Sequence, residues 1–274
     1  MQAPSTARDD DFRQRYGPCA VVAGASLGLG LAWSHALARR GLDVVMIAES
    51  DAPLNEVAAD VARQHGVSTT PLVVDLAQSD AAETIAAATL GLDVGIVVYN
   101  AAVSPIGRFI ATPTAALRAT IDVNCHGPTQ LCAAFAPRLV GRGRGALVLM
   151  SSLSAMQGQA MVGTYAATKA FNLVFAESLW NELADEGVDV LAVCPGATRT
   201  PGFEASRPRL RGLLAPPVMP PEPVIEEALA ALGRQPVLIP GRSNRLAAWA
   251  FRHLVPRRAA VRLMSRATRA MYER

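Results

Sequence analysis

Short apolar runs alternate with longer stretches of helical periodicity from residue 18 to residue 194. The runs are five to seven residues long and rich in valine, isoleucine and leucine, as expected for strands buried on both faces of a sheet. This alternation predicts βαβ units and therefore an α/β fold with a doubly wound parallel sheet and helices on both faces. About seven strands are predicted, at Cys19–Ala23, Val44–Ala48, Thr70–Val74, Val94–Tyr99, Ala146–Met150, Val188–Cys194 and Val237–Ile239.

The segments between the predicted strands have the length and periodicity of amphipathic helices. Several of them are followed by a glycine, the residue that most readily adopts the left-handed conformation at a helix end. A cluster of prolines between Thr200 and Pro223 instead predicts a long, partly ordered loop. The predicted helices are Leu29–Arg40, Pro53–His65, Pro113–Val140, Tyr165–Glu186 and Val224–Leu232.

Length and composition exclude several classes of protein. A chain of 274 residues with 51% hydrophobic and 18% charged residues can bury a full core and is not disordered. It has no apolar run of about 18 residues that could span a membrane. The polar, aspartate-rich segment before Tyr16 is unlike a secretory signal, which predicts a cytoplasmic protein. Because the four cysteines and four histidines lack metal-binding or disulfide spacing, we expect reduced thiols and no metal site.

Positive charge is concentrated at the C-terminal end of the chain. The formal net charge is +3, but residues 241–274 alone hold nine arginines and one acid, which gives this segment +8. Two helices are predicted there, Arg245–Val255 and Arg257–Tyr272, and each carries an apolar stripe beside its arginines. We therefore divide the chain into a single domain at 18–240 and a basic amphipathic helical tail at 241–274.

An amphipathic basic tail has two interpretations. Its apolar stripe can pack on the domain or on another subunit, or it can make a peripheral contact with an anionic membrane surface. We favour packing, and with it a homodimer or homotetramer. A nucleic-acid partner is not expected, because no recognisable reading module is present.

A glycine-rich turn, GASLGLG at residues 24–30, follows the first predicted strand and opens the first helix. Glycines at such a turn let the backbone approach a pyrophosphate, whose charge then faces the helix N-terminus. Glu49 ends the second strand, 19 positions after Gly30, where a carboxylate often accepts hydrogen bonds from ribose hydroxyls. The pattern predicts a dinucleotide site within 19–100, although Glu49 could also be a solvated loop acid.

Tyr165 and Lys169 are four residues apart on a predicted helix and therefore share one face of it. A tyrosine with a pKa of about 10 is a poor proton donor or acceptor at neutral pH. A nearby ammonium favours the phenolate, so we expect Lys169 to lower the pKa of Tyr165. Lys169 is the only lysine of the chain, which strengthens a functional interpretation of this pair.

Taken in order, these motifs resemble the classical branch of the short-chain dehydrogenase/reductase family over about residues 18–240. The turn Ala23–Gly30 is similar to the family's TGxxxGxG. Asp75-Leu76 is similar to the pair that contacts the adenine ring, and residues 99–102 are similar to the NNAG strand end. The segment 195–200 is similar to the PGxxxT stretch beside the nicotinamide. The resemblance implies a Rossmann-type fold.

The catalytic residues of the family have counterparts in the segment 120–200. Ser152 stands 13 residues before Tyr165, the usual spacing, and Asn124 falls in the long fourth crossover helix. The resemblance implies that Tyr165 is the general acid/base and that Ser152 orients the substrate oxygen. It also implies that Lys169 tunes the tyrosine and holds the nicotinamide ribose, and that Asn124 anchors a water of the proton relay.

The resemblance further implies a nicotinamide cofactor. NAD is favoured over NADP, because Glu49 would repel a 2′-phosphate and no arginine or lysine lies between Gly41 and Ala62. Against this, the position at which NAD-selecting relatives have an aspartate is Ala48. The implied cofactor-binding residues are Gly24, Ser26, Leu27, Gly28, Leu29, Gly30, Glu49, Asp75, Leu76, Asn100, Ala101, Tyr165, Lys169, Pro195, Gly196, Thr198 and Thr200.

Three residues depart from the family pattern near the cofactor. Ala23, Tyr99 and Ala102 stand where the family usually has threonine, asparagine and glycine. Since the four catalytic residues are all present, we expect these changes to adjust cofactor affinity without removing the site.

The segment 201–223 corresponds to the family's substrate lid. It mixes apolar residues with three arginines, which favours a hydrophobic or lipid-like ketone or alcohol, although the same residues could simply pack the loop onto the domain. We predict a nicotinamide-dependent oxidoreductase that interconverts a secondary alcohol and a ketone. The alternatives are a carrier-linked 3-oxoacyl reductase and a non-catalytic nucleotide-sensing protein. The residues named for the lid are Phe203, Arg207, Arg209, Leu210, Arg211, Leu213, Leu214, Val218 and Met219.

Overall fold

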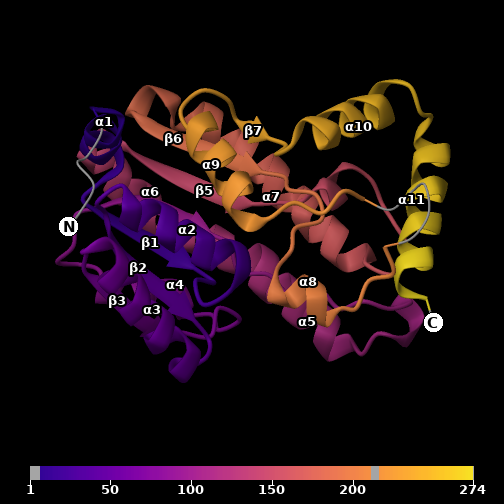
Figure 1. Cartoon of the computed structure of the whole chain (residues 1–274), viewed down its shortest axis with the longest axis horizontal. Helices are drawn as coiled ribbons and strands as arrows, with labels where there is room; N and C mark the ends of the chain where they lie inside the picture. The colour runs from indigo at the N-terminus through magenta and orange to yellow at the C-terminus, as the bar shows by residue number, and fades with distance from the viewer. Residues whose placement is uncertain (1–6, 211–215, 274) are drawn as a thin grey trace.

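The computed structural model describes residues 7–210 and 216–273, and places a parallel sheet between two layers of helices (Figure 1). The strand order is β3-β2-β1-β4-β5-β6-β7. This confirms the predicted doubly wound sheet, and every predicted strand end lies within one residue of the observed end. The strands are β1 Cys19–Ala23, β2 Asp43–Ala48, β3 Thr69–Val73, β4 Val94–Tyr99, β5 Gly145–Met150, β6 Val188–Val193 and β7 Val237–Leu238.

The winding of the sheet reverses between β1 and β4, which are neighbours although two strands separate them in sequence. Ala23 at the end of β1 pairs with Tyr99 at the end of β4, so the loops that follow both strands leave the sheet side by side. A parallel sheet leaves a crevice at such a switch point, where ligands of this fold class bind. The topology therefore places a binding site beside the glycine-rich turn.

Two separate cores lie on the two faces of the sheet. On one face, Trp33 of α2 (Gly28–Arg39), Leu54 of α3 (Asp51–His65) and Val224 of α9 (Pro221–Ala231) are fully buried. On the other face, Ile85, Phe135 and Ala176 are fully buried, and they belong to α4 (Ala81–Ala88), α6 (Gly127–Arg142) and α7 (Gly163–Glu182). The strands between the two layers are buried on both faces, except for the edge strand β3.

Two helices of the domain were not expected from the sequence. In α1 (Ala7–Tyr16) charged residues interrupt any apolar period, and α4 is mostly alanine, so neither gives a strong periodic signal. The end of α1 is fixed to the sheet by side chains: the Tyr16 hydroxyl donates to Asp189 at 2.6 Å, and Arg15 forms a salt bridge with the same carboxylate.

The long helix predicted at Pro113–Val140 is divided in two. The structure has α5 (Thr114–Ile121), a π-helical turn at Asp122–His126, and then α6. In the π-helical pattern the Val123 carbonyl would accept from the N–H of residue 128, but that residue is a proline and has none. The hydroxyl of Tyr99 donates to this carbonyl instead, at 2.6 Å. The departure at Tyr99 therefore has a structural reason.

The C-terminal tail forms α10 (Arg242–His253) and α11 (Arg257–Tyr272) (Figure 1). Hydrogen bonds join α11 to the domain. The Thr268 hydroxyl donates to the Gln159 side-chain oxygen at 3.0 Å, and the Ala160 N–H donates to the Ser265 hydroxyl at 3.0 Å. The predicted packing on the domain is thus found for α11. The apolar stripe of α10 does not pack on the domain, with Leu246, Trp249 and Leu254 exposed by 67%, 53% and 66%, so its packing on another subunit stays a prediction. Among the described residues no helix is long and apolar enough to cross a membrane.

Both ends of the predicted loop 201–223 are helical in the structure. A helix, α8 (Pro201–Ala205), begins at Thr200, whose hydroxyl accepts from the N–H of Phe203 at 3.2 Å. The helix α9 begins at Pro221, earlier than expected, because proline is well suited to the first position of a helix. Arg211, Leu213 and Leu214 of the predicted lid lie outside the described residues.

Candidate active site

Tyr165 and Lys169 lie one turn apart on α7 and line a cavity of about 660 Å³ at the carboxyl ends of β5 and β6. Lys169 is only 2% exposed, and its Nζ donates to the Met150 carbonyl at 2.7 Å. Burial lowers the pKa of Lys169 to about 8, because the ammonium is poorly solvated there. Nζ lies 5.7 Å from the centre of the Tyr165 ring, so its charge is held next to the phenol.

The environment of Tyr165 favours the neutral phenol. Burial is the largest influence and raises the pKa of this group, a hydrogen bond with Ser152 lowers it, and Tyr272 raises it further. Burial prevails over the other influences on this pKa, and the expectation that Lys169 lowers the pKa of Tyr165 stays a prediction. A neutral phenol beside an ammonium can donate a proton to a ligand oxygen and can be reprotonated afterwards.

Ser152 is fixed at the point where β5 ends. Its hydroxyl oxygen accepts from the Ser154 N–H at 3.1 Å and so caps a short 3-10 helix, Leu153–Met156. Its neighbour Ser151 is buried and donates to the Lys169 carbonyl at 2.7 Å, which joins the strand end to α7. Ser152 also lines the catalytic cavity, so one residue serves as both helix cap and hydrogen-bonding group of the cavity.

Asn124 lies behind the cavity rather than in its wall. It is fully buried, and its amide donates to the Val103 carbonyl at 2.9 Å and to the Thr168 hydroxyl at 3.0 Å. Its oxygen accepts from the Val103 N–H at 2.8 Å. The side chain therefore ties the loop after β4 to α7, next to Lys169. The predicted role in anchoring a water stays a prediction.

The glycine-rich turn is shaped so closely that side chains would not fit. A Cβ at Gly30 would overlap the Gly24 carbonyl, and Gly24 itself has φ of 80° with a Cβ position 2.7 Å from the backbone of Ala101. The N-cap of α2 is Leu27, whose side chain makes no capping hydrogen bond. The first N–H groups of α2 thus have no side-chain cap, as a helix that binds a phosphate requires.

A second cavity of about 430 Å³ surrounds this turn at the ends of β1, β2 and β4. Glu49 and Asp75 are the carboxylates in its wall. Asp75 accepts from Gln78 at 2.8 Å and from the Ala77 N–H at 2.9 Å, and these hydrogen bonds lower its pKa. No arginine or lysine among the described residues lines this cavity.

The two cavities adjoin each other, and five residues line both: Leu29, Asn100, Ala102, Thr200 and Gly202. A dinucleotide could therefore extend from Glu49 to Lys169. Most predicted cofactor residues line one cavity or the other, and Gly30 is the exception, since its role is the close approach to Gly24. The predicted residues beside the nicotinamide line the catalytic cavity: Pro195, Gly196, Thr198 and Thr200.

Part of the catalytic cavity's wall is not predicted from the sequence. α11 contributes Met264, Ala267, Thr268, Met271 and Tyr272, although more than 90 residues separate it from Tyr165. The spacing of these residues predicts one face of a helix, but it does not indicate which part of the molecule this face contacts. Of the predicted lid, Phe203 lines the cavity, whereas Arg207 and Arg209 are exposed and do not.

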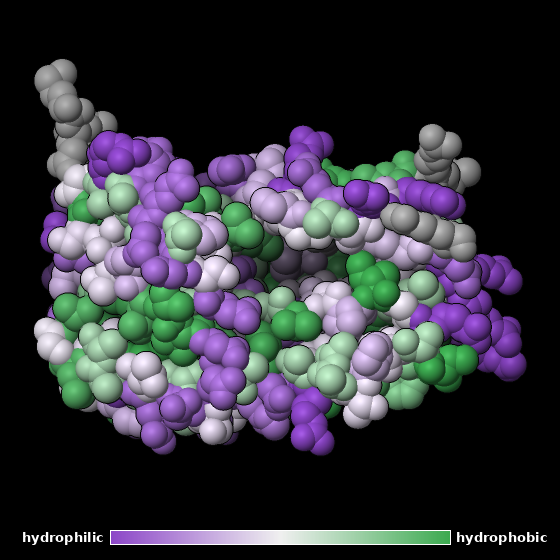
Figure 2. All heavy atoms as spheres, turned by 90° about the horizontal axis from the view of Figure 1, so that it is seen from below, coloured by the Kyte–Doolittle hydropathy of each residue, from purple (hydrophilic) through white to green (hydrophobic). Residues whose placement is uncertain are grey.

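One face of the molecule is hollowed near its middle, and apolar side chains border the hollow (Figure 2). The catalytic cavity itself is lined mainly by apolar groups, with Ser152, Tyr165 and Lys169 at its inner end. This arrangement suits a hydrophobic ligand whose single oxygen reaches the polar end. Among the described residues no cluster of three or more histidine, cysteine, aspartate or glutamate side chains could hold a metal.

Comparison with known proteins agrees with this geometry. The short chain dehydrogenase family profile matches residues 18–211. A 7β-hydroxysteroid dehydrogenase of Clostridium sardiniense is 31% identical over 235 residues, which cover 86% of this chain and 90% of the relative. A solved structure from work on 7β-hydroxysteroid dehydrogenase stereoselectivity has a TM-score of 0.86 and 30% identity, and the match covers 92% of this chain and 98% of that one.

A short-chain dehydrogenase from Sphingobium yanoikuyae, solved in complex with NADPH, has a TM-score of 0.74 and 29% identity, with 85% of this chain and 92% of that chain covered. The chain belongs to the short-chain dehydrogenase/reductase family. It is an NAD(P)-dependent oxidoreductase that acts on CH–OH groups.

Proposed function

We propose that the protein interconverts a secondary alcohol and a ketone on a hydrophobic, steroid-sized substrate. The observation that carries this proposal is that Ser152, Tyr165 and Lys169 line one largely apolar cavity, which adjoins the cavity around the glycine-rich turn. The hydroxysteroid dehydrogenases among its relatives support a steroid or a molecule of similar size.

The cofactor, when bound, supplies or accepts a hydride at the nicotinamide ring. In the direction of reduction, the Tyr165 hydroxyl donates its proton to the substrate oxygen, and the Ser152 hydroxyl donates a hydrogen bond that holds that oxygen in place. Lys169, fixed by the Met150 carbonyl, keeps a positive charge beside the phenolate that forms. Asn124 holds the loop after β4 against α7, the helix that carries Tyr165 and Lys169.

The apolar wall supports the substrate class. Ile106, Val162, Phe203, Met264 and Met271 surround the space in front of Tyr165. Methionine side chains adapt to irregular apolar shapes, so two of them suit a large rigid ligand. A small polar alcohol would leave this surface uncovered.

For the cofactor we propose NAD rather than NADP. The support is that Glu49 lines the adenosine end and that no described arginine or lysine does. A 2′-phosphate there would face a carboxylate without a compensating cation. Dissociation constants for NADH and NADPH test this proposal, and tighter binding of NADPH would overturn it. A Glu49→Arg variant should shift the ratio towards NADPH.

The oligomeric state stays a prediction of a homodimer or homotetramer. Its support is an exposed apolar surface on adjacent helices, with Ile121 of α5 and Phe171 and Val174 of α7 exposed by 42%, 42% and 60%. The exposed stripe of α10 offers a second such surface. Sizing of the protein by light scattering tests this, and flotation with anionic vesicles tests the alternative that the tail binds a membrane.

The decisive experiment measures cofactor oxidation by the purified protein across a panel of ketones. Reduction of keto steroids and other bulky ketones, with small polar ketones poorly used, is the expected result. Reduction confined to 3-oxoacyl thioesters on a carrier would support the carrier-linked reductase instead. Cofactor binding without turnover of any ketone or alcohol would support the nucleotide sensor.

A further inference from the structure

The first turn of α10 is fixed to the domain, whereas the rest of the helix is not. The Arg245 side chain donates to Glu227 at 2.7 Å, and the Asn244 amide donates to the Pro240 carbonyl at 2.8 Å. Among the described residues of α10 only Asn244 is buried. The helix therefore extends from the carboxyl end of the sheet along the outside of the molecule (Figure 1).

The exposed face of α10 combines apolar and basic side chains. Leu246 and Trp249 are three residues apart and share this face, and they are exposed by 67% and 53%. Arg242, four residues before Leu246, is exposed on the same face. Arg252, three residues after Trp249, is exposed at its other end. An apolar centre flanked by cations is typical of helices that lie in the interface of an anionic membrane.

The positive charge of the tail is not neutralised within the described part of the protein. Arg242, Arg252 and Arg258 are exposed and form no salt bridge among the described residues. The segment 241–274 carries +8, whereas the rest of the chain carries −5, since the net charge is +3. This uneven distribution gives α10 and the start of α11 a positive surface that attracts anions.

A second copy of the chain is a poor partner for this face. Two α10 helices in contact would bring the same arginines together with no acid between them, and like charges repel. A helix of 12 residues is about 18 Å long and about 10 Å wide, so the footprint of α10 is roughly 200 Å². A stable dimer needs about 800 Å² from each partner. The exposed apolar residues of α5 and α7 offer an oligomer a surface on other helices.

An anionic lipid surface suits both the apolar and the basic part of the face. Tryptophan is enriched where the hydrocarbon of a bilayer meets the headgroups, and arginines near an anionic leaflet add to the attraction. Guanidinium groups bind lipid phosphates through paired, charge-assisted hydrogen bonds. A fluid bilayer also adapts its shape to a single helix, so a small footprint is sufficient for reversible binding.

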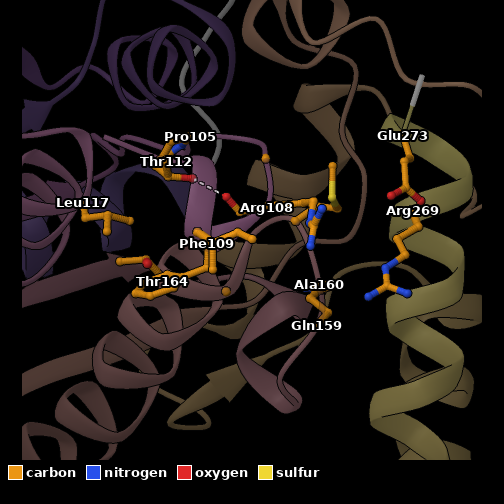
Figure 3. A pocket seen from close by; sticks show the side chains of 14 residues that line it. Pro105, Arg108, Phe109, Thr112, Leu117, Gln159, Ala160, Thr164, Arg269 and Glu273 are labelled. Carbon is orange, nitrogen blue, oxygen red and sulfur yellow. Dashed lines mark hydrogen bonds between the residues drawn. The ribbon is translucent and has the colours of Figure 1, made fainter. Parts of the chain in front are cut away.

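The last turns of α11 do not belong to this surface, because they face the domain. Arg269 and Glu273 border a third cavity, of about 450 Å³, opposite Arg108 and Phe109 (Figure 3). The Arg269 side chain is turned towards this cavity (Figure 3). The positive surface therefore comprises α10 and the first turns of α11.

We propose that α10 binds the enzyme to an anionic membrane surface, with Leu246 and Trp249 in the headgroup interface and Arg242 and Arg252 on lipid phosphates. The docking goes beyond the proposed function and does not depend on it. Its consequence for catalysis does: Asn244 of α10 lines the catalytic cavity, so a substrate dissolved in the bilayer would have a path of about one helix length, ~18 Å, to that cavity.

Flotation of the full-length protein with lipid vesicles tests the proposal. We expect binding to phosphatidylcholine vesicles that contain about 30% phosphatidylglycerol to be at least about tenfold stronger than to phosphatidylcholine alone, and to weaken as salt is raised to about 1 M. Trp249→Ser should weaken binding by about tenfold, because one large apolar side chain is lost from the interface. Arg252→Gln should weaken it by about fivefold, the contribution of one cation.

Leu90→Ser and Arg144→Gln are the matched controls. Leu90 is 78% exposed and Arg144 is exposed, but both precede strands, at the amino end of the sheet, whereas α10 follows β7 at the carboxyl end. Both control variants should bind vesicles as the unmodified protein does. Thermal unfolding and cofactor affinity should be unchanged in all four variants, because these side chains are exposed and do not line the catalytic cavity.

No flotation with anionic vesicles would overturn the proposal, and so would equal binding to vesicles without phosphatidylglycerol. Binding that persists in Trp249→Ser and Arg252→Gln, or that is lost equally in the controls, would overturn it as well. Light scattering adds a test of the second copy: a lower mass of Trp249→Ser, without flotation of the unmodified protein, would show that another subunit covers α10. Flotation needs no turnover, so its result is separate from that of the ketone panel.

Discussion

The cofactor half and the substrate half of the site are built in different ways. Around the glycine-rich turn the wall is formed where β1, β2 and β4 end, and an added Cβ at Gly24 or Gly30 would collide with neighbouring backbone. The substrate side consists of loops, the short helix α8 and the distant helix α11, and much of it is exposed. The first half is determined by local sequence, whereas the second depends on docking between segments far apart in the chain.

Tyr165→Phe should give the largest effect, because it removes the proton donor between the two halves and leaves both walls intact. We expect kcat to fall by about a thousandfold, within the range of general acid catalysis. Cofactor affinity should change little. Steady-state kinetics and a cofactor dissociation constant measure both quantities.

Tyr272→Phe is the control for that variant, since its hydroxyl lines the same cavity but makes only a 3.5 Å contact with Ser206. We expect less than about a threefold change in kcat. Similar losses in both variants would contradict the assignment of Tyr165 as the proton donor.

Gly30→Ala tests the cofactor half, where the new methyl would overlap the Gly24 carbonyl. We expect cofactor affinity to fall by at least about a hundredfold, or the protein to lose about 3 kcal/mol of stability through backbone strain. Isothermal titration and thermal unfolding distinguish the two outcomes. Gly91→Ala is the matched control, because nothing lies within 4 Å of its added Cβ, and unchanged behaviour of Gly30→Ala would contradict the packing described.

Removal of residues 256–274 tests the substrate half alone. Without α11 the catalytic cavity loses one wall, so kcat/KM for a bulky ketone should fall by about tenfold, as expected for the loss of a few apolar contacts. The value for a small ketone and the affinity for the cofactor should stay nearly constant. An equal loss of cofactor affinity would show that the tail supports the whole domain rather than the substrate side.

We expect pH to have a small effect on the free energy of unfolding, through two histidines in the helices beside the cofactor half. Nδ1 of His35 in α2 and Nε2 of His65 in α3 lie 3.0 Å apart, and burial lowers the pKa of both rings despite the raising influence of Asp60. Glu222 also raises the pKa of His35, and Arg39 lowers both values. Below the unfolded-state pKa of about 6.5, the unfolded chain takes up more protons than the folded one.

The free energy of unfolding should therefore decrease as the pH falls from about 7.5 to about 5.5, where histidines are the main groups that titrate. Denaturant unfolding at the two pH values measures this decrease. His65→Asn should reduce it, whereas His253→Asn, on exposed α10, should not. A stability that rises towards pH 5.5 would contradict the lowered pKa values.

The same contrast explains what the sequence could predict. The strands, the glycine-rich turn and the Tyr165–Lys169 pair depend on local pattern, and each was found within a residue of its expected place or on its expected helix face. The role of α11 depends on long-range hydrogen bonds such as that from Thr268 to Gln159, which no local spacing reveals. The raised pKa of Tyr165 likewise follows from burial among several elements, and not from its helical neighbour.

The hydrogen bond from Tyr99 to the Val123 carbonyl has an evolutionary consequence. A Cβ at residue 127 would collide with the Tyr99 hydroxyl, so the tyrosine requires a glycine there, and the proline at 128 requires the tyrosine. These three positions form an epistatic set: substituting the asparagine usual in the family at residue 99 would leave a buried carbonyl without a donor. Sequences that diverge from this one should exchange the three residues together or keep all of them.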